Sequence, residues 1–148
     1  MELDPTLDYR QHPERYPIGR GERGVLTVEP YKSELLPLWR FKTPDVATAS
    51  VTALLERYAH YKEDCDFVGM DMARKFLQMG YTRSRRYARH PTGRKYDPTT
   101  GRERPLEEED PVKAASATIF KHALQHVKSD PDYQRLKRAH QQQQRALR

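Results

Sequence analysis

The chain has 148 residues, of which 36% are hydrophobic and 32% are charged, and its mean hydropathy is −1.01. This length suits one domain with a modest core, since domains commonly run to about 100–150 residues. No run approaches the ~18 apolar residues of a membrane span, and the first residues lack the apolar segment of a secretion signal. The single cysteine, Cys65, excludes an internal disulfide and a cysteine-pair zinc site. We therefore expect a cytoplasmic protein without membrane contact.

The N-terminal third of the chain predicts little helix. Residues 1–17 contain three prolines among charged residues and show no periodicity, so we expect an extended arm. The β-branched segment Val25–Val28 lies between Gly24 and Pro30, which predicts a short strand or hairpin arm. A single helical turn is expected over 33–40, ended or kinked by a proline.

The central part of the chain carries clear helix signals. A threonine N-cap and Pro44 at the first helical position open a helix that runs to about residue 62. Asp66 caps a second helix, and Gly80 is placed to end it as a C′ glycine. A third, short helix is expected over 82–90. Because a glycine turn separates these last two helices, their order also fits a helix-turn-helix.

The last third repeats one start signal twice. Asp110-Pro111 and Asp130-Pro131 each combine an N-cap aspartate with proline at the first helical position, and they predict helices over about 111–128 and 131–146. Together the elements predict a mainly α fold, formally a small α+β domain with a short N-terminal β-strand or hairpin. We place the arm at 1–17, a single compact domain at 18–136 and a polar, fraying helix end at 137–148.

The net charge of +6 arises in one stretch of the chain. Residues 74–95 hold eight Lys and Arg and no acid, whereas the rest has 19 Lys and Arg against 21 Asp and Glu. Unopposed cations at helical spacing repel one another unless an anion binds, and arginine suits bidentate phosphate contacts. We therefore expect a nucleic-acid-binding site, with tyrosines as stacking partners. Its residues are Arg74, Lys75, Tyr81, Arg83, Arg85, Arg86, Tyr87, Arg89, Arg94 and Lys95.

Other interpretations of this basic stretch stay open. It can bind a small phosphorylated or nucleotide ligand, pair internally with the acids of 107–110, or meet an acidic protein partner as an adaptor. Trp39 and Phe41 are expected in the core below it, while Arg40 and Lys42 alternate outward and extend the patch. His122 and His126 lie four residues apart on an expected helix, but no third ligand suggests itself, so we assign no metal.

The segment GRGERGV fits the pattern G-x-G-x-x-G. A dinucleotide loop needs a helix directly after its glycines, and here a strand-like segment follows, so we assign no cofactor. Turn glycines with positive φ are the simpler explanation. The alternative is an anion-binding turn made of Gly19, Arg20, Gly21, Arg23 and Gly24. The residues as a whole favour a non-enzymatic binding module over an enzyme.

Two blocks of the sequence, IGRGERGVLTVEPYKS and MARKFLQMGYTRSRRYA, are followed by GRKYDP. They resemble an uncharacterised family of bacterial and tailed-phage proteins that is defined as a domain of unknown function. The resemblance extends from about Tyr16 to Leu136 and implies an intracellular single-domain protein. It implies no activity, cofactor or catalytic residue.

Overall fold

A computed structural model describes residues 2–90, 96–102 and 109–147 of the chain. Within these ranges the structure is mainly helical, as expected. Its five α-helices are α1 (Tyr31–Leu35), α2 (Pro44–Glu63), α3 (Phe67–Arg89), α4 (Pro111–Lys128) and α5 (Pro131–Ala146), with 3₁₀ turns at Pro13–Arg15 and Leu36–Leu38. None of the helices in the described ranges is long and apolar enough to cross a membrane.

The expected capping residues start four of these helices. Thr43, Asp66, Asp110 and Asp130 each accept a hydrogen bond from a backbone N–H in the first turn of the helix that follows. In α2, α4 and α5 a proline occupies the first turn, where its missing N–H costs nothing. These caps confirm the helix starts predicted for α2, α3, α4 and α5. The starts could be predicted because capping involves only residues close together in the sequence.

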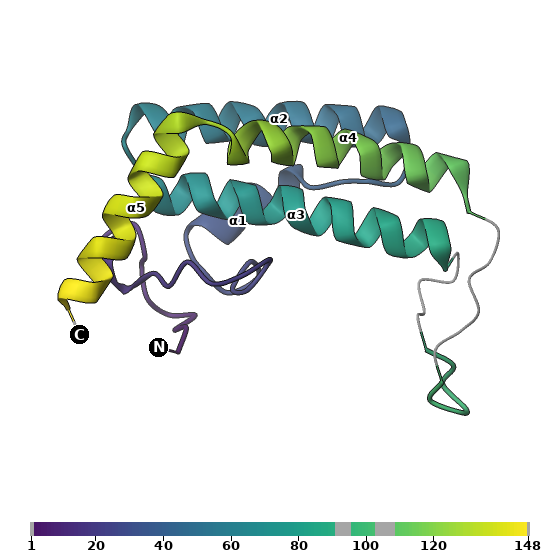
Figure 1. The fold of residues 1–148 in the computed structure, drawn as a ribbon, viewed down its shortest axis with the longest axis horizontal. Coiled ribbons are helices and arrows are strands. Elements are labelled where there is room, and N and C mark those ends of the chain that lie inside the picture. The colour runs from purple at the N-terminus through teal and green to yellow at the C-terminus, as the bar shows by residue number, and fades with distance from the viewer. Residues whose placement is uncertain (1, 91–95, 103–108, 148) are drawn as a thin grey trace.

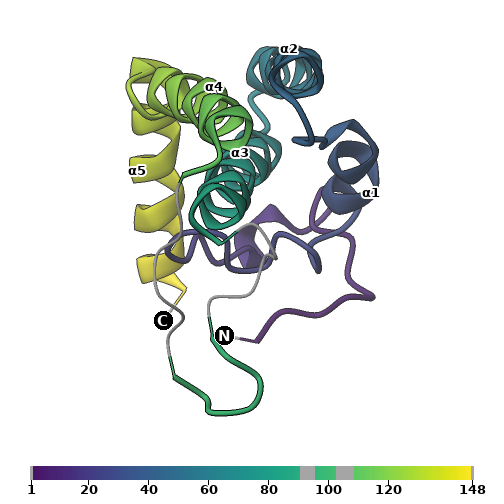
Figure 2. The same cartoon turned by 90° about the vertical axis from the view of Figure 1, so that its right-hand side faces the viewer.

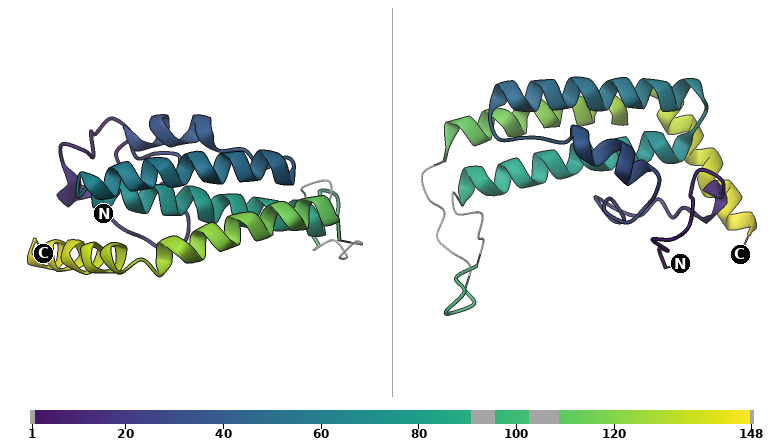
Figure 3. Two further views of the ribbon diagram at one scale, coloured as in Figure 1. Left: turned by 90° about the horizontal axis from the view of Figure 1, so that it is seen from above. Right: turned by 180° about the vertical axis from the view of Figure 1, so that it is seen from behind.

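The long helix α3 lies at the centre of the fold and contacts α1, α2, α4 and α5. Figure 1 shows α2 and α4 running side by side above α3, and Figure 2 shows the same three helices end-on as a triangle, with α5 and α1 on opposite flanks. The N-terminal segment passes beneath α3, and the view from behind in Figure 3 places α1 between that segment and α2. The other four α-helices of the described ranges are therefore all positioned against α3.

The prediction of two helices with a break at Gly80 was wrong, because α3 is continuous through residues 67–89. Gly80 is fully helical, and a Cβ atom there would overlap the ring of Phe120 in α4. This glycine therefore allows two helices to approach closely instead of ending one. The helix-turn-helix prediction was therefore also wrong, because no turn separates two helices in this segment.

The predicted strand was also wrong. Residues 25–28 form successive turns, in which the backbone N–H groups of Thr27 and Val28 donate to the Gly24 carbonyl at 3.0 and 3.1 Å. Gly24 has a φ of 85°, so the chain reverses before an extended segment can form. Asp8 and Glu29 form an isolated β-bridge, and no strand is found in the described ranges. The apolar residues of this segment are held in turns.

The N-terminal arm and the C-terminal helix hold each other. Tyr9 and Tyr16 of the arm are buried, with exposed fractions of 1% and 0%. The ring of the buried His140 in α5 lies 2.7 Å from the Tyr16 carbonyl oxygen, and Gln144 Nε2 donates to the same oxygen at 2.5 Å. The polar end of the chain, expected to fray from residue 137, is helical to Ala146 and anchored by these two contacts.

We predict that Gly80→Ala destabilises the protein by about 1–3 kcal/mol, as expected for overpacking in a helix contact. Helix propensity alone predicts the opposite sign, a gain of about 1 kcal/mol. The measurement is urea unfolding of wild type, Gly80→Ala and the double variant Gly80→Ala with Phe120→Leu. The smaller leucine side chain in the double variant should relieve part of the loss. A more stable Gly80→Ala protein would contradict the close approach of α3 and α4.

Candidate nucleic-acid interface

The first half of α3 carries a buried ionic cluster centred on Asp71. The exposed fractions of Asp71, Arg74 and Lys75 are 0%, 6% and 1%. Arg74 donates from Nε and Nη2 to Asp71 Oδ1 at 3.1 and 2.9 Å. The Tyr133 hydroxyl donates to the same oxygen at 2.6 Å, and the Tyr16 hydroxyl donates to Oδ2. One carboxylate thus connects α3 to α5 and to the N-terminal arm.

The two buried cations reach from this cluster to the glycine turn. Arg74 Nη1 donates to the Gly21 carbonyl at 2.6 Å, and Lys75 Nζ donates to the Arg23 carbonyl at 2.6 Å. Burial lowers the pKa of Lys75 to about 8, against the attraction of Asp71, whose Oδ2 lies 3.8 Å from Nζ. Arg74 and Lys75, which the sequence places among the predicted nucleic-acid contacts, are thus largely buried and are held by bonds within the protein. Both residues fix the glycine turn from within.

The glycines of this turn have the backbone conformation that only glycine adopts without strain. Gly19, Gly21 and Gly24 have φ values of 67°, 58° and 85°. At Gly24 a side chain is also excluded by contact, since a Cβ atom would lie 2.7 Å from Leu3 Cδ1. The G-x-G-x-x-G spacing is thus accounted for by the path of the chain, and the helix required after a dinucleotide loop does not follow it.

The second half of α3 presents a different set of cations. Arg86 and Arg89 are exposed and Arg83 is partly exposed, whereas Ser84 and Ala88 face inward with exposed fractions of 0%. No carboxylate among the described residues forms an ion pair with any of these three arginines. Their spacing of three residues places them along one side of the helix.

The remaining predicted cations divide differently. Arg85 is paired with Glu109, with 2.7 Å between Nη1 and Oε1, so one acid of the 107–110 run does pair internally. Asp110 is the N-cap of α4, and its backbone N–H donates to the Ala88 carbonyl. Arg94 and Lys95 lie outside the described residues. Among the described residues of α3, the exposed or partly exposed cations that form no ion pair with an acid are therefore in its last turns.

An aromatic pocket of about 460 Å³ includes Tyr87, from the same part of α3. Tyr87 lines one wall of it, and Trp39 and Phe41 line the other, with ring centroids 6.0 Å apart for Phe41 and Tyr87 and 4.9 Å for Trp39 and Phe41. Arg83 stands four residues before Tyr87, one helical turn away, and so shares its side of α3. Arg83 therefore lies near the pocket side of α3, whereas Arg86 and Arg89 lie about 100° and about 160° around the helix from Tyr87.

The rim of the pocket is cationic. Arg40, Lys42 and Lys113 line it, and Lys113 Nζ donates to the Lys42 carbonyl at 2.7 Å while lying 6.0 Å from the centroid of the Tyr87 ring. No acid is found among the described residues that line this pocket. The Trp39 indole N–H is buried and has no acceptor in the described part of the chain. The pocket thus offers ring surfaces and positive charge.

The sequence anticipated only part of this surface. Trp39 and Phe41 were expected in the core, and they do pack against it from one side, but they also line the pocket. The alternation of Trp39-Arg40-Phe41-Lys42 was the available signal. Lys113 carried no signal, because only the packing of α4 against α3 brings it to Tyr87. Tyr81, expected as a stacking partner, packs against the core and does not line this pocket.

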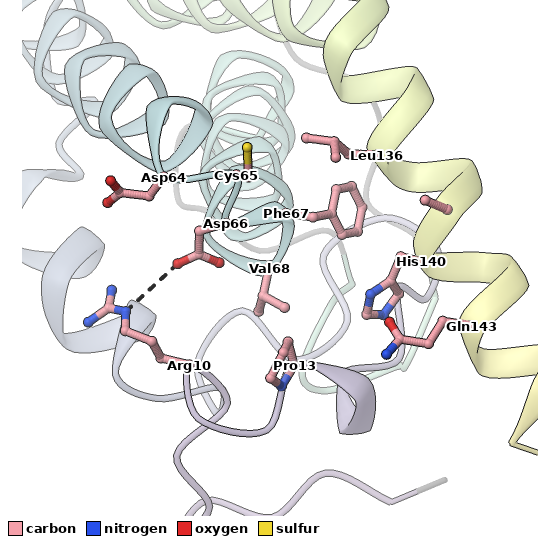
Figure 4. A pocket seen from close by; sticks show the side chains of 11 residues that line it. Arg10, Pro13, Asp64, Cys65, Asp66, Phe67, Val68, Leu136, His140 and Gln143 are labelled. Atoms are coloured by element: carbon pink, nitrogen blue, oxygen red, sulfur yellow. Dashed lines mark ion pairs between the residues drawn. The ribbon is translucent and has the colours of Figure 1, made fainter.

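A second pocket, of about 470 Å³, opens at the other end of α3, where the α2–α3 turn faces α5 (Figure 4). Its charges are mixed, since Asp64 and Asp66 accompany Arg10, whose Nε lies 3.7 Å from Asp66 Oδ2. Figure 4 shows the Cys65 thiol pointing away from His140, so the two do not form a catalytic pair. This pocket has no surplus of positive charge for a polyanion.

The chain matches a known protein family over nearly its whole length. The model for a domain of unknown function, DUF4385, matches residues 2–143, so the chain belongs to this family over nearly its whole length. The resemblance to a family of unknown function seen in the sequence is thereby confirmed. Comparison with curated proteins and with solved structures gives no match.

We predict that Asp71→Asn costs about 3–5 kcal/mol of unfolding free energy, because it leaves two buried cations without their counter-charge. The matched control is Asp132→Asn, which removes the surface partner of Lys62 and Arg135 and should cost at most about 1 kcal/mol. Urea unfolding followed by circular dichroism compares the two. Equal stability of the two variants would show that the cluster does not hold the fold together.

Proposed function

We propose that this protein binds nucleic acid through the last turns of α3 and the aromatic pocket beside them. In this interface Arg83, Arg86 and Arg89 contact backbone phosphates, and bases stack against the rings of the pocket. The observation that carries the proposal is a set of arginines in the last turns of α3, without acidic partners among the described residues, together with an aromatic pocket with a cationic rim that includes Tyr87 of the same turns.

Electrostatic cost supports a polyanion over a neutral partner. Like charges three and four residues apart on a helix repel one another by a few tenths of a kcal/mol per pair. The ion pair with Glu109 compensates the charge of Arg85, but no acid among the described residues compensates the charges of Arg83, Arg86 and Arg89. A phosphate chain that lies along this side of α3 would bring one negative charge to each of them. Arginine also presents paired N–H donors that match phosphate oxygens.

The aromatic pocket favours unpaired bases. A base can stack on the rings of this pocket only if it is not stacked in a duplex, and ring stacking tolerates any base. The cationic rim of Arg40, Lys42 and Lys113 lies where the backbone of such a nucleotide would leave the pocket. We therefore infer a preference for single-stranded segments, with little selection of sequence.

The triple variant Arg83→Ala, Arg86→Ala, Arg89→Ala should weaken binding to a single-stranded oligonucleotide and flatten its salt dependence. Each lost phosphate contact lowers the slope of log affinity against log salt by about 0.7, so the expected change is about 2. Fluorescence anisotropy between roughly 50 and 200 mM salt measures it. The charge-matched control Arg15→Ala, Arg135→Ala, Arg138→Ala removes exposed arginines from other elements. If both triple variants behave alike, only net charge matters and the proposed interface is wrong.

Tyr87→Ala should reduce affinity for a single-stranded oligonucleotide about 5–150-fold, because stacking on one aromatic ring contributes about 1–3 kcal/mol per base. Affinity for a duplex of the same length should stay within about twofold, since paired bases do not reach the ring. Tyr81→Ala is the control, as Tyr81 lies outside the pocket. Equal losses for single strand and duplex would remove the stacking role. Trp39 is the only tryptophan, so its fluorescence reports on the pocket directly.

A further inference from the structure

A third pocket, of about 490 Å³, lies where the glycine turn meets α3, the end of α4 and the start of α5. It is separate from the aromatic pocket, with which it shares no lining residue. Four cations line it, and none of the described residues that line it is acidic. These cations are Arg20, Arg74, Lys128 and Lys137, and Gly19, Gly21, Tyr133 and Gln134 complete the wall.

Arg74 gives this pocket a fixed donor at its floor. Its side chain is only 8% exposed and is held on one side by Asp71 and on the other by the Gly21 carbonyl. These bonds use three of the five N–H groups of the guanidinium, so one N–H on each Nη atom is left for a ligand. A donor held in this way loses little conformational entropy when an anion binds.

The backbone of the turn adds further donors. Positive φ values at Gly19 and Gly21 fold the chain back on itself at this wall of the pocket. The backbone N–H groups of Gly19, Arg20, Gly21 and Glu22 donate to no acceptor within the described residues. Consecutive free N–H groups in a glycine turn form the kind of concavity in which phosphate oxygens bind.

We propose that this pocket binds a phosphate group, either as orthophosphate or as the terminal phosphate of a small phosphorylated molecule. Arg20, Lys128 and Lys137 add three cations to Arg74, which is paired with Asp71. The described lining holds no acid, which favours a dianion, and the guanidinium matches two phosphate oxygens at once. The volume is within the ~300–1,000 Å³ of small-molecule sites, so there is room for an organic group beyond the phosphate. The proposal does not depend on nucleic-acid binding by the far end of α3.

Of the five residues expected in an anion-binding turn, three line this pocket. Gly19, Arg20 and Gly21 do so, whereas Arg23 and Gly24 do not. The carbonyl of Arg23 accepts from Lys75, and Gly24 lies against Leu3. The donors that the sequence did not connect to the turn are Arg74, Lys128 and Lys137, since they come from three different helices.

The test is calorimetric titration of the full chain with inorganic phosphate and, separately, with a nucleoside monophosphate, at constant ionic strength set by chloride. Saturable binding of either ligand that weakens at least about tenfold in Arg20→Ala, Lys137→Ala supports the site. Neither side chain takes part in the Asp71 cluster, so the double variant should fold normally. Arg15→Ala, Arg138→Ala removes the same charge from residues outside the pocket and should bind as wild type does.

The two ligands separate the sources of the phosphate. Equal affinity for both assigns the site to orthophosphate, and tighter binding of the monophosphate assigns it to a phosphorylated molecule. No saturable binding of either ligand below about 10 mM would overturn the proposal, as would equal loss in the two double variants. Oligonucleotide binding by the double variant Arg20→Ala, Lys137→Ala should stay as in wild type. The phosphate site and the proposed nucleic-acid interface are therefore tested independently of each other.

Discussion

The fold depends on a single buried carboxylate. Asp71 is fully buried in the first turns of α3, and its two oxygens accept hydrogen bonds from Arg74, Tyr16 and Tyr133, which belong to α3, the N-terminal arm and α5. Burying such a charge is costly unless it is paired and fully hydrogen-bonded, and here both conditions hold. Lys75 lies beside it and extends the cluster to the glycine turn. The arm, the turn and the C-terminal helix are all held to α3 through this one group.

The same cluster divides the basic stretch into two parts with different roles. In the first half of α3 the cations point inward, where they hold carbonyl groups of the glycine turn. Further along the helix, Arg86 and Arg89 are exposed and Arg83 is partly exposed, one turn before Tyr87 of the aromatic pocket. A run of positive charge in the sequence is therefore not a single surface. Its inner half builds the fold, and its outer half is the part that can meet a polyanion.

The helix starts could be predicted from the sequence because they depend on neighbouring residues. Features that depend on contacts between residues far apart in the sequence could not be predicted. The N-caps Thr43, Asp66, Asp110 and Asp130 act within one turn, so the sequence alone places the helix starts. Gly80 was misjudged because its partner, Phe120, lies 40 residues further on, and sequence gives no sign of that contact. Likewise Arg74 looks the same in sequence as Arg83. In the folded protein, Arg74 is buried because Asp71, Tyr133 and the Gly21 carbonyl surround it, whereas Arg83 has no such neighbours among the described residues.

The division of the cations is tested most directly by hydrogen exchange of the arginine Nε–H groups, measured by NMR with and without a single-stranded oligonucleotide. The Arg74 Nε–H, donated to Asp71 in the interior, should exchange slowly in both samples. Those of Arg83, Arg86 and Arg89 should exchange fast in the free protein and slow down together when the oligonucleotide binds. Fast exchange at Arg74, or rates at the outer three that the oligonucleotide leaves unchanged, would contradict this account.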